Sequence, residues 1–211
     1  MKDIAIYCAG GFGKEVYCTM RRMNNPEWNF IGFFDDGVEK GKQLQYGVCL
    51  GGINELNAWA TSIDVCIANG NPRMLRRISE NIINPNVDFP NIIDPSCFFA
   101  DRKTNVIGKG NILCRGVGIS VNVSLGKFNV VNADGNFGHD ATVGDFNAFM
   151  PGVRISGEVK IGNENFWGFN SGIIQQKTVG NNVTVGAGAV LLRKPKDGCT
   201  YVGVPASMVK Y

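Results

Sequence analysis

The single histidine of the chain, His139, is followed directly by a carboxylic acid, Asp140. Imidazole has a reference pKa of about 6.5, so it can accept a proton near neutral pH. A neighbouring carboxylate can orient the ring and stabilise the imidazolium that forms. The pair therefore predicts general base catalysis, in which a nucleophile loses its proton as it attacks. A purely structural role is the alternative for a lone histidine.

The sequence around this pair has a period of six residues. Stepping by six, we find a large apolar residue at 15 consecutive positions: Ile107, Leu113, Ile119, Leu125, Val131, Phe137, Val143, Phe149, Ile155, Ile161, Trp167, Ile173, Val179, Val185 and Leu191. This period fits neither an amphipathic helix nor an alternating strand, and it identifies a hexapeptide repeat. His139 stands two residues after an inward position, so we expect it near a corner of a coil and outside the core.

The other hexad positions predict a three-sided coil. The residue after the apolar one is glycine in 8 of the 15 hexads, and the fifth residue is mostly small or narrow. We expect a short flat strand to supply both inward side chains, and the glycine to let the chain turn into the next face. Three hexads then close one coil, and each coil buries its apolar side chains only by stacking on its neighbours. Phe146, Phe166 and Trp167 are expected on the outside.

The first 95 residues alternate strands and helices. We expect strands at 3–9, 30–34, 63–68 and 89–93, and helices at 14–23, 53–60 and from about 72 to 84. This order is typical of a small parallel sheet with right-handed crossovers. The sequence thus predicts a Rossmann-like α/β domain over residues 1–94 and a β-helix over residues 95–211.

A glycine turn, Gly10 to Gly13, follows the first predicted strand. Its backbone N–H groups and the helix N-terminus after it can cradle a phosphate. Asp35 ends the second strand, where a Rossmann domain would bind a ribose. Two interpretations stay open: the glycines serve packing alone, or they hold a nucleotide. Val16 occupies the third position of the dinucleotide fingerprint, which argues against NAD.

Composition argues against several classes of partner. The 21 basic and 18 acidic residues nearly balance, which gives no reason to expect nucleic acid or a membrane surface. Seven cysteines form no CxxC pair and predict reduced thiols. The sequence shows no signal peptide and no apolar run of membrane length, so we expect a cytoplasmic protein. We also expect no metal site.

Asp3 to Gly13, Phe33 to Gly37, Ile67 to Arg73 and the hexads together resemble one family of enzymes. They are similar to the sugar O- and N-acetyltransferases of the sialic-acid O-acetyltransferase type, which include the bacterial acetyltransferases of UDP-4-amino sugars and GDP-perosamine. The resemblance covers essentially the whole chain. It implies a left-handed parallel β-helix, a homotrimer with active sites between subunits, and acetyl-CoA as co-substrate. It also implies an N-terminal domain that binds a nucleotide sugar, and a place in polysaccharide biosynthesis.

The resemblance assigns roles by position. It implies that His139 is the general base, with Asp140 beside it, and that the backbone N–H of Gly157 binds the thioester oxygen. The positions matched to substrate binding are Gly11, Gly13, Asp35, Asp36, Gly70, Asn71 and Asn132. The positions matched to coenzyme A are Gly157, Phe169, Gly186, Ala187 and Pro205. Ala133 and Asp134 depart from the family's usual serine and threonine.

The expected reaction is direct transfer of an acetyl group from acetyl-CoA to the amine of a nucleotide-linked amino sugar. No cysteine adjoins His139 in the sequence, which disfavours an acyl-enzyme. The alternatives are O-acetylation of a sugar such as sialic acid, a non-catalytic β-helix that acts as a binding module, and an NAD-dependent oxidoreductase. The last would leave the β-helix without a role.

Overall fold

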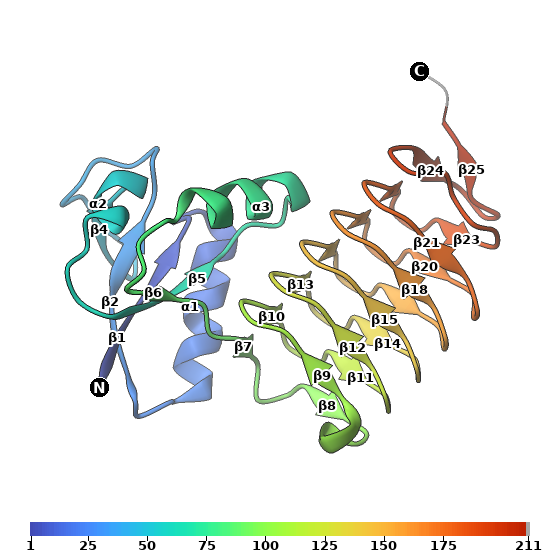
Figure 1. Cartoon of the computed structure of the whole chain (residues 1–211), viewed down its shortest axis with the longest axis horizontal. Helices are drawn as coiled ribbons and strands as arrows, with labels where there is room; N and C mark the ends of the chain where they lie inside the picture. The colour runs from blue at the N-terminus through green and yellow to red at the C-terminus, as the bar shows by residue number, and fades with distance from the viewer. Residues whose placement is uncertain (210–211) are drawn as a thin grey trace.

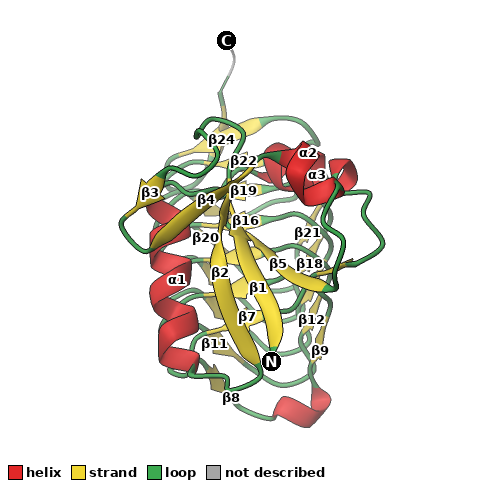
Figure 2. Ribbon diagram, turned by 90° about the vertical axis from the view of Figure 1, so that its left-hand side faces the viewer, coloured by secondary structure: helices red, strands yellow, loops and turns green. Residues whose placement is uncertain are grey.

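The computed structural model describes residues 1–209 as two units that lie side by side along the long axis of the molecule (Figure 1). The elements of the first unit are β1 (Lys2–Tyr7), α1 (Gly11–Met23), β2 (Trp28–Phe34), β3 (Gln43–Leu44), β4 (Gly47–Gly51), α2 (Ile53–Asn57), β5 (Ile63–Ile67), α3 (Pro72–Asn81) and β6 (Val87–Asp88). The strand order is β3-β4-β2-β1-β5-β6, with β3 antiparallel to β4 and the other pairs parallel. Figure 2 shows α1 on one side of this sheet and α2 and α3 on the other. The Rossmann-like prediction is confirmed.

The central strand β1 sets the position of the loops. Ile4, Ala5 and Ile6 are completely buried, as expected of a parallel strand covered on both faces. Its neighbours β2 and β5 run parallel to it, so the turns after all three strands open at the same edge of the sheet. We call this edge, formed by residues 8–11, 35–37 and 68–71, the carboxyl edge.

Two predictions for this unit are wrong. The β3–β4 hairpin lies in a stretch where no strand was expected. The strand predicted over residues 89–93 does not form, because Pro90 has no N–H to donate to a sheet. Instead, the first unit ends its sheet at Asp88, and Ile92–Ile93 forms β7, which pairs with Ile112–Leu113 of the second unit.

The second unit is a left-handed parallel β-helix with three faces. The first face contains β7 (Ile92–Ile93), β10 (Ile112–Leu113), β13 (Val130–Val131), β16 (Ala148–Phe149), β19 (Phe166–Trp167), β22 (Thr184–Val185), β24 (Thr200–Val202) and the antiparallel β25 (Ser207–Met208). The second face contains β8 (Phe98–Phe99), β11 (Gly118–Ile119), β14 (Asn136–Phe137), β17 (Arg154–Ile155), β20 (Gly172–Ile173) and β23 (Val190–Leu191). The third face contains β9 (Val106–Ile107), β12 (Ser124–Leu125), β15 (Thr142–Val143), β18 (Lys160–Ile161) and β21 (Thr178–Val179). No helix in the described residues is long and apolar enough to cross a bilayer.

The predicted inward positions form the core of this prism. Every apolar residue of the repeat from Leu113 to Leu191 is buried. Trp167 is completely buried and stacks on Phe149, so its expected place on the outside was wrong. The stack also begins earlier than the repeat. In the first coil, the 3₁₀ turn Arg102–Thr104 lengthens the chain, so the step from Phe98 to its partner Gly118 is longer than the step from Gly118 to Asn136 in the next coil.

Each face is joined to the next by a corner. We call the turns after the first, second and third faces the first, second and third corners. The turn residue at each corner has a left-handed φ, as in Asp140 and Glu158, and most of these residues are not glycine. We had expected the glycine after the apolar residue to make the turn, and this prediction is wrong. The glycine allows coils to stack closely: a Cβ at Gly138 would lie 2.5 Å from the backbone nitrogen of Gly157.

A ladder of buried asparagines runs along the inside of the third corner. Asn111, Asn129, Asn147 and Asn165 are completely buried, and each lies one coil beyond the one before it. The side chain of Asn147 accepts a hydrogen bond from the backbone N–H of Asn165 at 2.9 Å and donates one to the carbonyl of Gly162 at 2.9 Å. The ladder thus satisfies backbone groups that the corner leaves without strand partners.

Asn147→Ala removes one step of this ladder. It leaves the buried Asn165 N–H and the partly buried Gly162 carbonyl without these partners, so we expect the free energy of unfolding to fall by about 3 kcal/mol. Urea denaturation followed by circular dichroism measures this change. Asn136→Ala, an exposed asparagine on the second face, is the control and should change the value by no more than about 0.5 kcal/mol. Equal effects would contradict the ladder's role.

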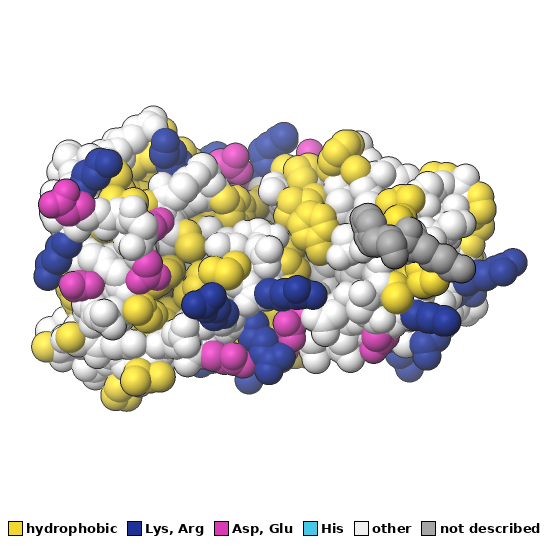
Figure 3. Space-filling view, turned by 90° about the horizontal axis from the view of Figure 1, so that it is seen from above, with side chains coloured by type: hydrophobic (Ala, Val, Ile, Leu, Met, Phe, Trp, Pro, Cys, Tyr) yellow, Lys and Arg dark blue, Asp and Glu magenta, His cyan; other side chains and the backbone are white. Residues whose placement is uncertain are grey.

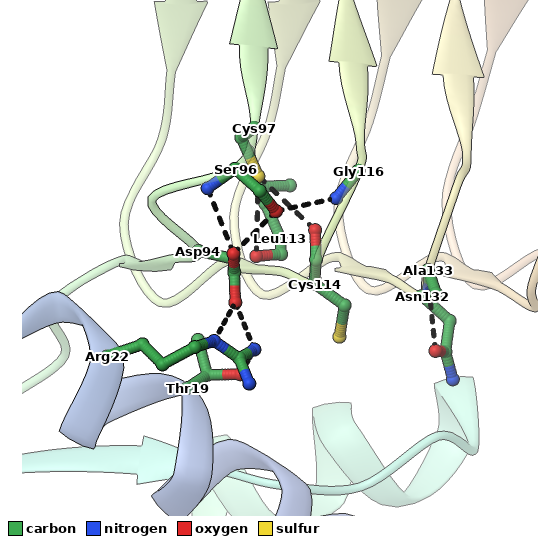
Figure 4. Close-up of polar contacts among 10 residues, drawn as sticks. All are labelled: Thr19, Arg22, Asp94, Ser96, Cys97, Leu113, Cys114, Gly116, Asn132 and Ala133. Carbon is green, nitrogen blue, oxygen red and sulfur yellow. Dashed lines mark hydrogen bonds and ion pairs between the residues drawn. The ribbon is translucent and has the colours of Figure 1, made fainter.

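An ion pair between a half-exposed arginine and a buried carboxylate joins the two units at the start of the prism (Figure 4). Arg22, on α1, binds Asp94, which follows β7 and has a side chain only 2% exposed. Burial would raise the pKa of the Asp94 carboxyl, but hydrogen bonds from Ser96 and Arg22 outweigh burial and hold this pKa below its ordinary value. A carboxyl with a lowered folded-state pKa stabilises the folded state above its unfolded pKa, and this contribution is lost as the pH falls through the folded value.

Asp94→Asn should therefore destabilise the protein most at neutral pH. We expect the free energy of unfolding to fall by about 1–3 kcal/mol at pH 7. The difference from the unaltered protein should begin to shrink below about pH 4, where the carboxyl of the unfolded chain becomes protonated, and should disappear once the folded protein is protonated as well. Denaturation curves at several pH values test this, with the exposed Glu27→Gln as control. A difference that does not change with pH would exclude the ion pair as its source.

Candidate active site

The second corner carries the predicted catalytic pair. His139 and Asp140 follow β14, and the His139 side chain is 57% exposed, so the ring lies outside the core as predicted. Its Nδ1 lies 2.8 Å from Asp140 Oδ2. A carboxylate can only accept, so Nδ1 carries the proton of the neutral ring and Nε2 keeps a free lone pair. The arrangement fixes the tautomer of the neutral His139 ring and leaves Nε2 able to accept a proton.

Asp140 is held in turn by a residue that sequence reasoning missed. Asn122 Nδ2, one coil earlier at the same corner, donates to Asp140 Oδ1 at 3.0 Å. The hydrogen bond from His139, and then the one from Asn122, hold the pKa of the Asp140 carboxyl below its ordinary value. Asp140 therefore stays ionised at neutral pH. Three hexads separate Asn122 from Asp140, so stepping back by one full coil of the repeat would have pointed to it.

Gly157 lies one coil beyond His139 on the same corner. A Cβ at this glycine would lie 2.6 Å from His139 Nε2, so the ring needs the space that glycine leaves. Within residues 1–209, the backbone N–H of Gly157 has no hydrogen-bond acceptor. The third corner differs, because there a side-chain oxygen such as that of Asn163 accepts from the equivalent N–H of Asp145. A free N–H and a free imidazole nitrogen thus lie next to each other.

The carboxyl edge of the first unit collects the predicted substrate residues of that unit. Asp35 Oδ2 accepts from the backbone N–H of Ala9 at 2.8 Å, which joins the ends of β2 and β1. Asp36 accepts from the Ile53 N–H at 2.8 Å and from the Tyr7 hydroxyl. The two carboxylates line a hollow of about 270 Å³.

The glycines of the first turn differ in their surroundings. A Cβ at Gly13 would lie 2.1 Å from the carbonyl oxygen of Cys8, so this glycine is required for packing. No atom lies within 4 Å of a Cβ placed at Gly10 or Gly11, so packing does not explain them. Gly10 is the N-cap of α1 and makes no side-chain capping bond. The N-terminal N–H groups of α1 are therefore available to an anion.

The first corner faces this edge. Asn132 lies in a cavity of about 510 Å³ between α1 and the first corner, with Lys14 and Arg115 among its other lining residues. Gly70 approaches the Met150 methyl group, which would lie 3.6 Å from a Cβ at Gly70. Met150 stands one coil beyond Asn132 and was also missed, although a step of one coil along the repeat points to it. Asn71 accepts from the Met74 N–H at 3.2 Å and caps α3.

Comparison with known proteins agrees with this architecture. Residues 3–82 match the family model of the PglD N-terminal domain. Over 190 residues, the chain is 28% identical to the GDP-perosamine N-acetyltransferase of Escherichia coli O157:H7, covering 89% of this chain and 85% of that protein. The acetyltransferase domain of PglB from Neisseria gonorrhoeae FA1090 superposes with a TM-score of 0.90 at 28% identity, over 99% of this chain and 100% of that one. WeeI from Acinetobacter baumannii AYE gives 0.89 at 27% identity, with the same coverage.

Over essentially its whole length, the chain is similar to hexapeptide-repeat sugar acetyltransferases. It is therefore an enzyme, and the interpretations as a binding module and as an oxidoreductase are set aside. The PglB domain has also been solved in complex with acetyl coenzyme A, and that structure superposes with a TM-score of 0.86 at 29% identity, over 99% of both chains.

In this acetyltransferase, the predicted site residues divide between two corners. Phe169, which is 57% exposed, and Gly186 and Ala187 lie at the first corner, on later coils than Asn132. Pro205 is exposed in the turn between β24 and β25. His139, Asp140 and Gly157 lie at the second corner. A single chain thus brings the catalytic pair to Gly157, but it does not bring them to the residues predicted to hold the two substrates.

Proposed function

We propose that this acetyltransferase moves the acetyl group of acetyl-CoA to the amine of a nucleotide-linked amino sugar, of the UDP-4-amino-sugar or GDP-perosamine type. The observation that carries the proposal is the arrangement at the second corner. His139 presents a free Nε2, with Nδ1 held by Asp140, directly beside the unpaired N–H of Gly157. An amine acceptor is favoured over a hydroxyl because the matched E. coli relative is an N-acetyltransferase.

The reaction we propose is direct. His139 Nε2 takes a proton from the amine as its nitrogen attacks the thioester carbon. The oxyanion that forms accepts a hydrogen bond from the Gly157 N–H. Collapse of this intermediate breaks the carbon–sulfur bond, and the leaving thiolate receives the proton from the imidazolium. Asp140 remains ionised and stabilises the imidazolium between these two proton transfers.

Residues 1–94 would bind the nucleotide sugar, and residues 95–211 would carry the chemistry. The uncapped N-terminus of α1, at Gly11, is suited to the phosphates. Asp35, Asp36, Gly70 and Asn71 line the same edge, and Asn132 would face the sugar. Coenzyme A would lie along Phe169, Gly186, Ala187 and Pro205. Because these groups lie at the first corner and His139 at the second, we propose a homotrimer in which each site combines two chains.

His139→Ala should lower kcat by a factor of about 10² or more and leave folding unchanged. Release of free CoA thiol with UDP-, GDP-, CMP- and dTDP-linked amino sugars measures the rate and identifies the nucleotide. Matched sugars with a hydroxyl in place of the amine separate N- from O-acetylation. Gln176→Ala, an exposed residue two coils further along the same corner, is the control. Unchanged turnover in His139→Ala would exclude the imidazole as the base.

Mixed oligomers test whether a site combines two chains. His139→Ala removes the base, and Asp35→Ala weakens the edge that would bind the nucleotide sugar. At acceptor concentrations well below KM, each variant alone should be slow. After joint refolding, mixed trimers contain sites with an intact edge from one chain and an intact His139 from another, so activity should return. Mixtures no faster than the mean of the two variants would place the whole site within one chain.

A further inference from the structure

Helix α3 carries one of the loops proposed to bind the nucleotide sugar. Asn71 is its N-cap, and Pro72 begins the helix directly after Gly70 and Asn71. A displacement of α3 therefore displaces this loop. The position of α3 relative to the prism then decides where the loop meets the first corner.

Contacts made by the loop before α3 and by the middle of the helix hold it across the first face. At the first corner, Gly70 approaches Met150. At the third corner, Arg76 Nη1 lies 2.6 Å from Glu164 Oε1, a partner far away in the sequence. Arg76 Nε also lies 2.8 Å from Glu80 Oε1, one turn along α3. In the view from above, basic and acidic side chains gather near the middle of the molecule (Figure 3).

The remaining docking contacts lie nearer the start of the prism. Phe89 packs edge-on against Phe128, and Phe128 stacks on Phe146 at the third corner. Arg22 binds Asp94 at the first coil. Phe128, Phe146 and Glu164 occupy equivalent places on three successive coils, each with a left-handed φ. The ion pair of Glu164 thus holds the first unit at a point further along the prism than these aromatic contacts.

The two partners of Arg76 differ in their surroundings. The Glu80 side chain is 59% exposed, whereas that of Glu164 is 12% exposed. Exposed helical pairs contribute little, because water competes for both charges. A carboxylate that is largely withdrawn from water depends on its partner much more. Arg76 is therefore held to the prism by Glu164, and Glu80 adds only a local contact.

From these contacts we infer that Glu164 is a positioning residue: its ion pair with Arg76 holds α3, and with it the Gly70–Asn71 loop, in register with the first corner for the acceptor substrate. The inference rests on the proposed function. It predicts that Glu164 affects the binding of the nucleotide sugar and leaves the binding of acetyl-CoA unchanged, because α3 carries no residue proposed to bind coenzyme A.

The test compares Glu164→Ala with Glu80→Ala, which removes the other partner of the same arginine. Each substrate is varied while the other is saturating. Glu164→Ala should lower kcat/KM for the nucleotide amino sugar by about 10-fold, because a small displacement of a binding loop costs much of the productive geometry. The KM for acetyl-CoA should change less than about 2-fold, and Glu80→Ala should change neither value by more than about 2-fold.

Exchange of the two charges separates position from general loss of structure. Arg76→Glu combined with Glu164→Arg restores the pair and should recover most of the acceptor kcat/KM. If Glu164→Ala matches Glu80→Ala, or if both substrates are affected equally, the positioning role is wrong. If the unaltered protein transfers no acetyl group to any nucleotide amino sugar, the proposed function fails, and the inference fails with it.

Discussion

Stacking of successive coils at a fixed register is the constraint on which the rest of this structure depends. Each strand inside a face of the prism pairs with the strands of the coils before and after it, so no coil is complete alone. The buried asparagines extend this pairing into the third corner, where the backbone would otherwise lose partners. The glycines after the inward residues let neighbouring coils approach at the other positions. Any side chain at a corner is thereby placed directly over the equivalent side chain of the coil before it.

The same register builds the second corner, where we propose that catalysis takes place. Asn122, His139 and Gly157 follow one another on successive coils. Stacking therefore brings the residue that orients Asp140, the imidazole and a free backbone N–H together, and no separate loop is needed. A rigid stack suits general base catalysis, because the donor and the acceptor keep their separation throughout the reaction. The arrangement also requires glycine at position 157, because the His139 ring occupies the space that a side chain there would take.

The two units are joined by contacts of different kinds at different heights along the prism. Aromatic rings and the Arg22–Asp94 pair fasten the start, and Arg76 with Glu164 fastens a later coil. The carboxyl edge therefore meets the first corner in one defined orientation. The second corner, which carries His139, is separate from the first corner that meets this edge, which is why a second copy of the chain is the simplest way to complete the proposed site.

The hexads alone identified the prism, its inward residues and the exposed place of His139, because a six-residue period follows from local geometry that repeats without interruption. The alternation of strands and helices likewise predicted the Rossmann-like unit. Only the tertiary structure revealed the first coil, because the Arg102–Thr104 turn breaks the period, and only it showed that non-glycine residues make the corners. The places of Asn122, Met150 and Glu164, and the division of the site between two corners, depend on contacts between residues far apart in the chain. Those contacts are decided by stacking and docking, and no local pattern of residue types records them.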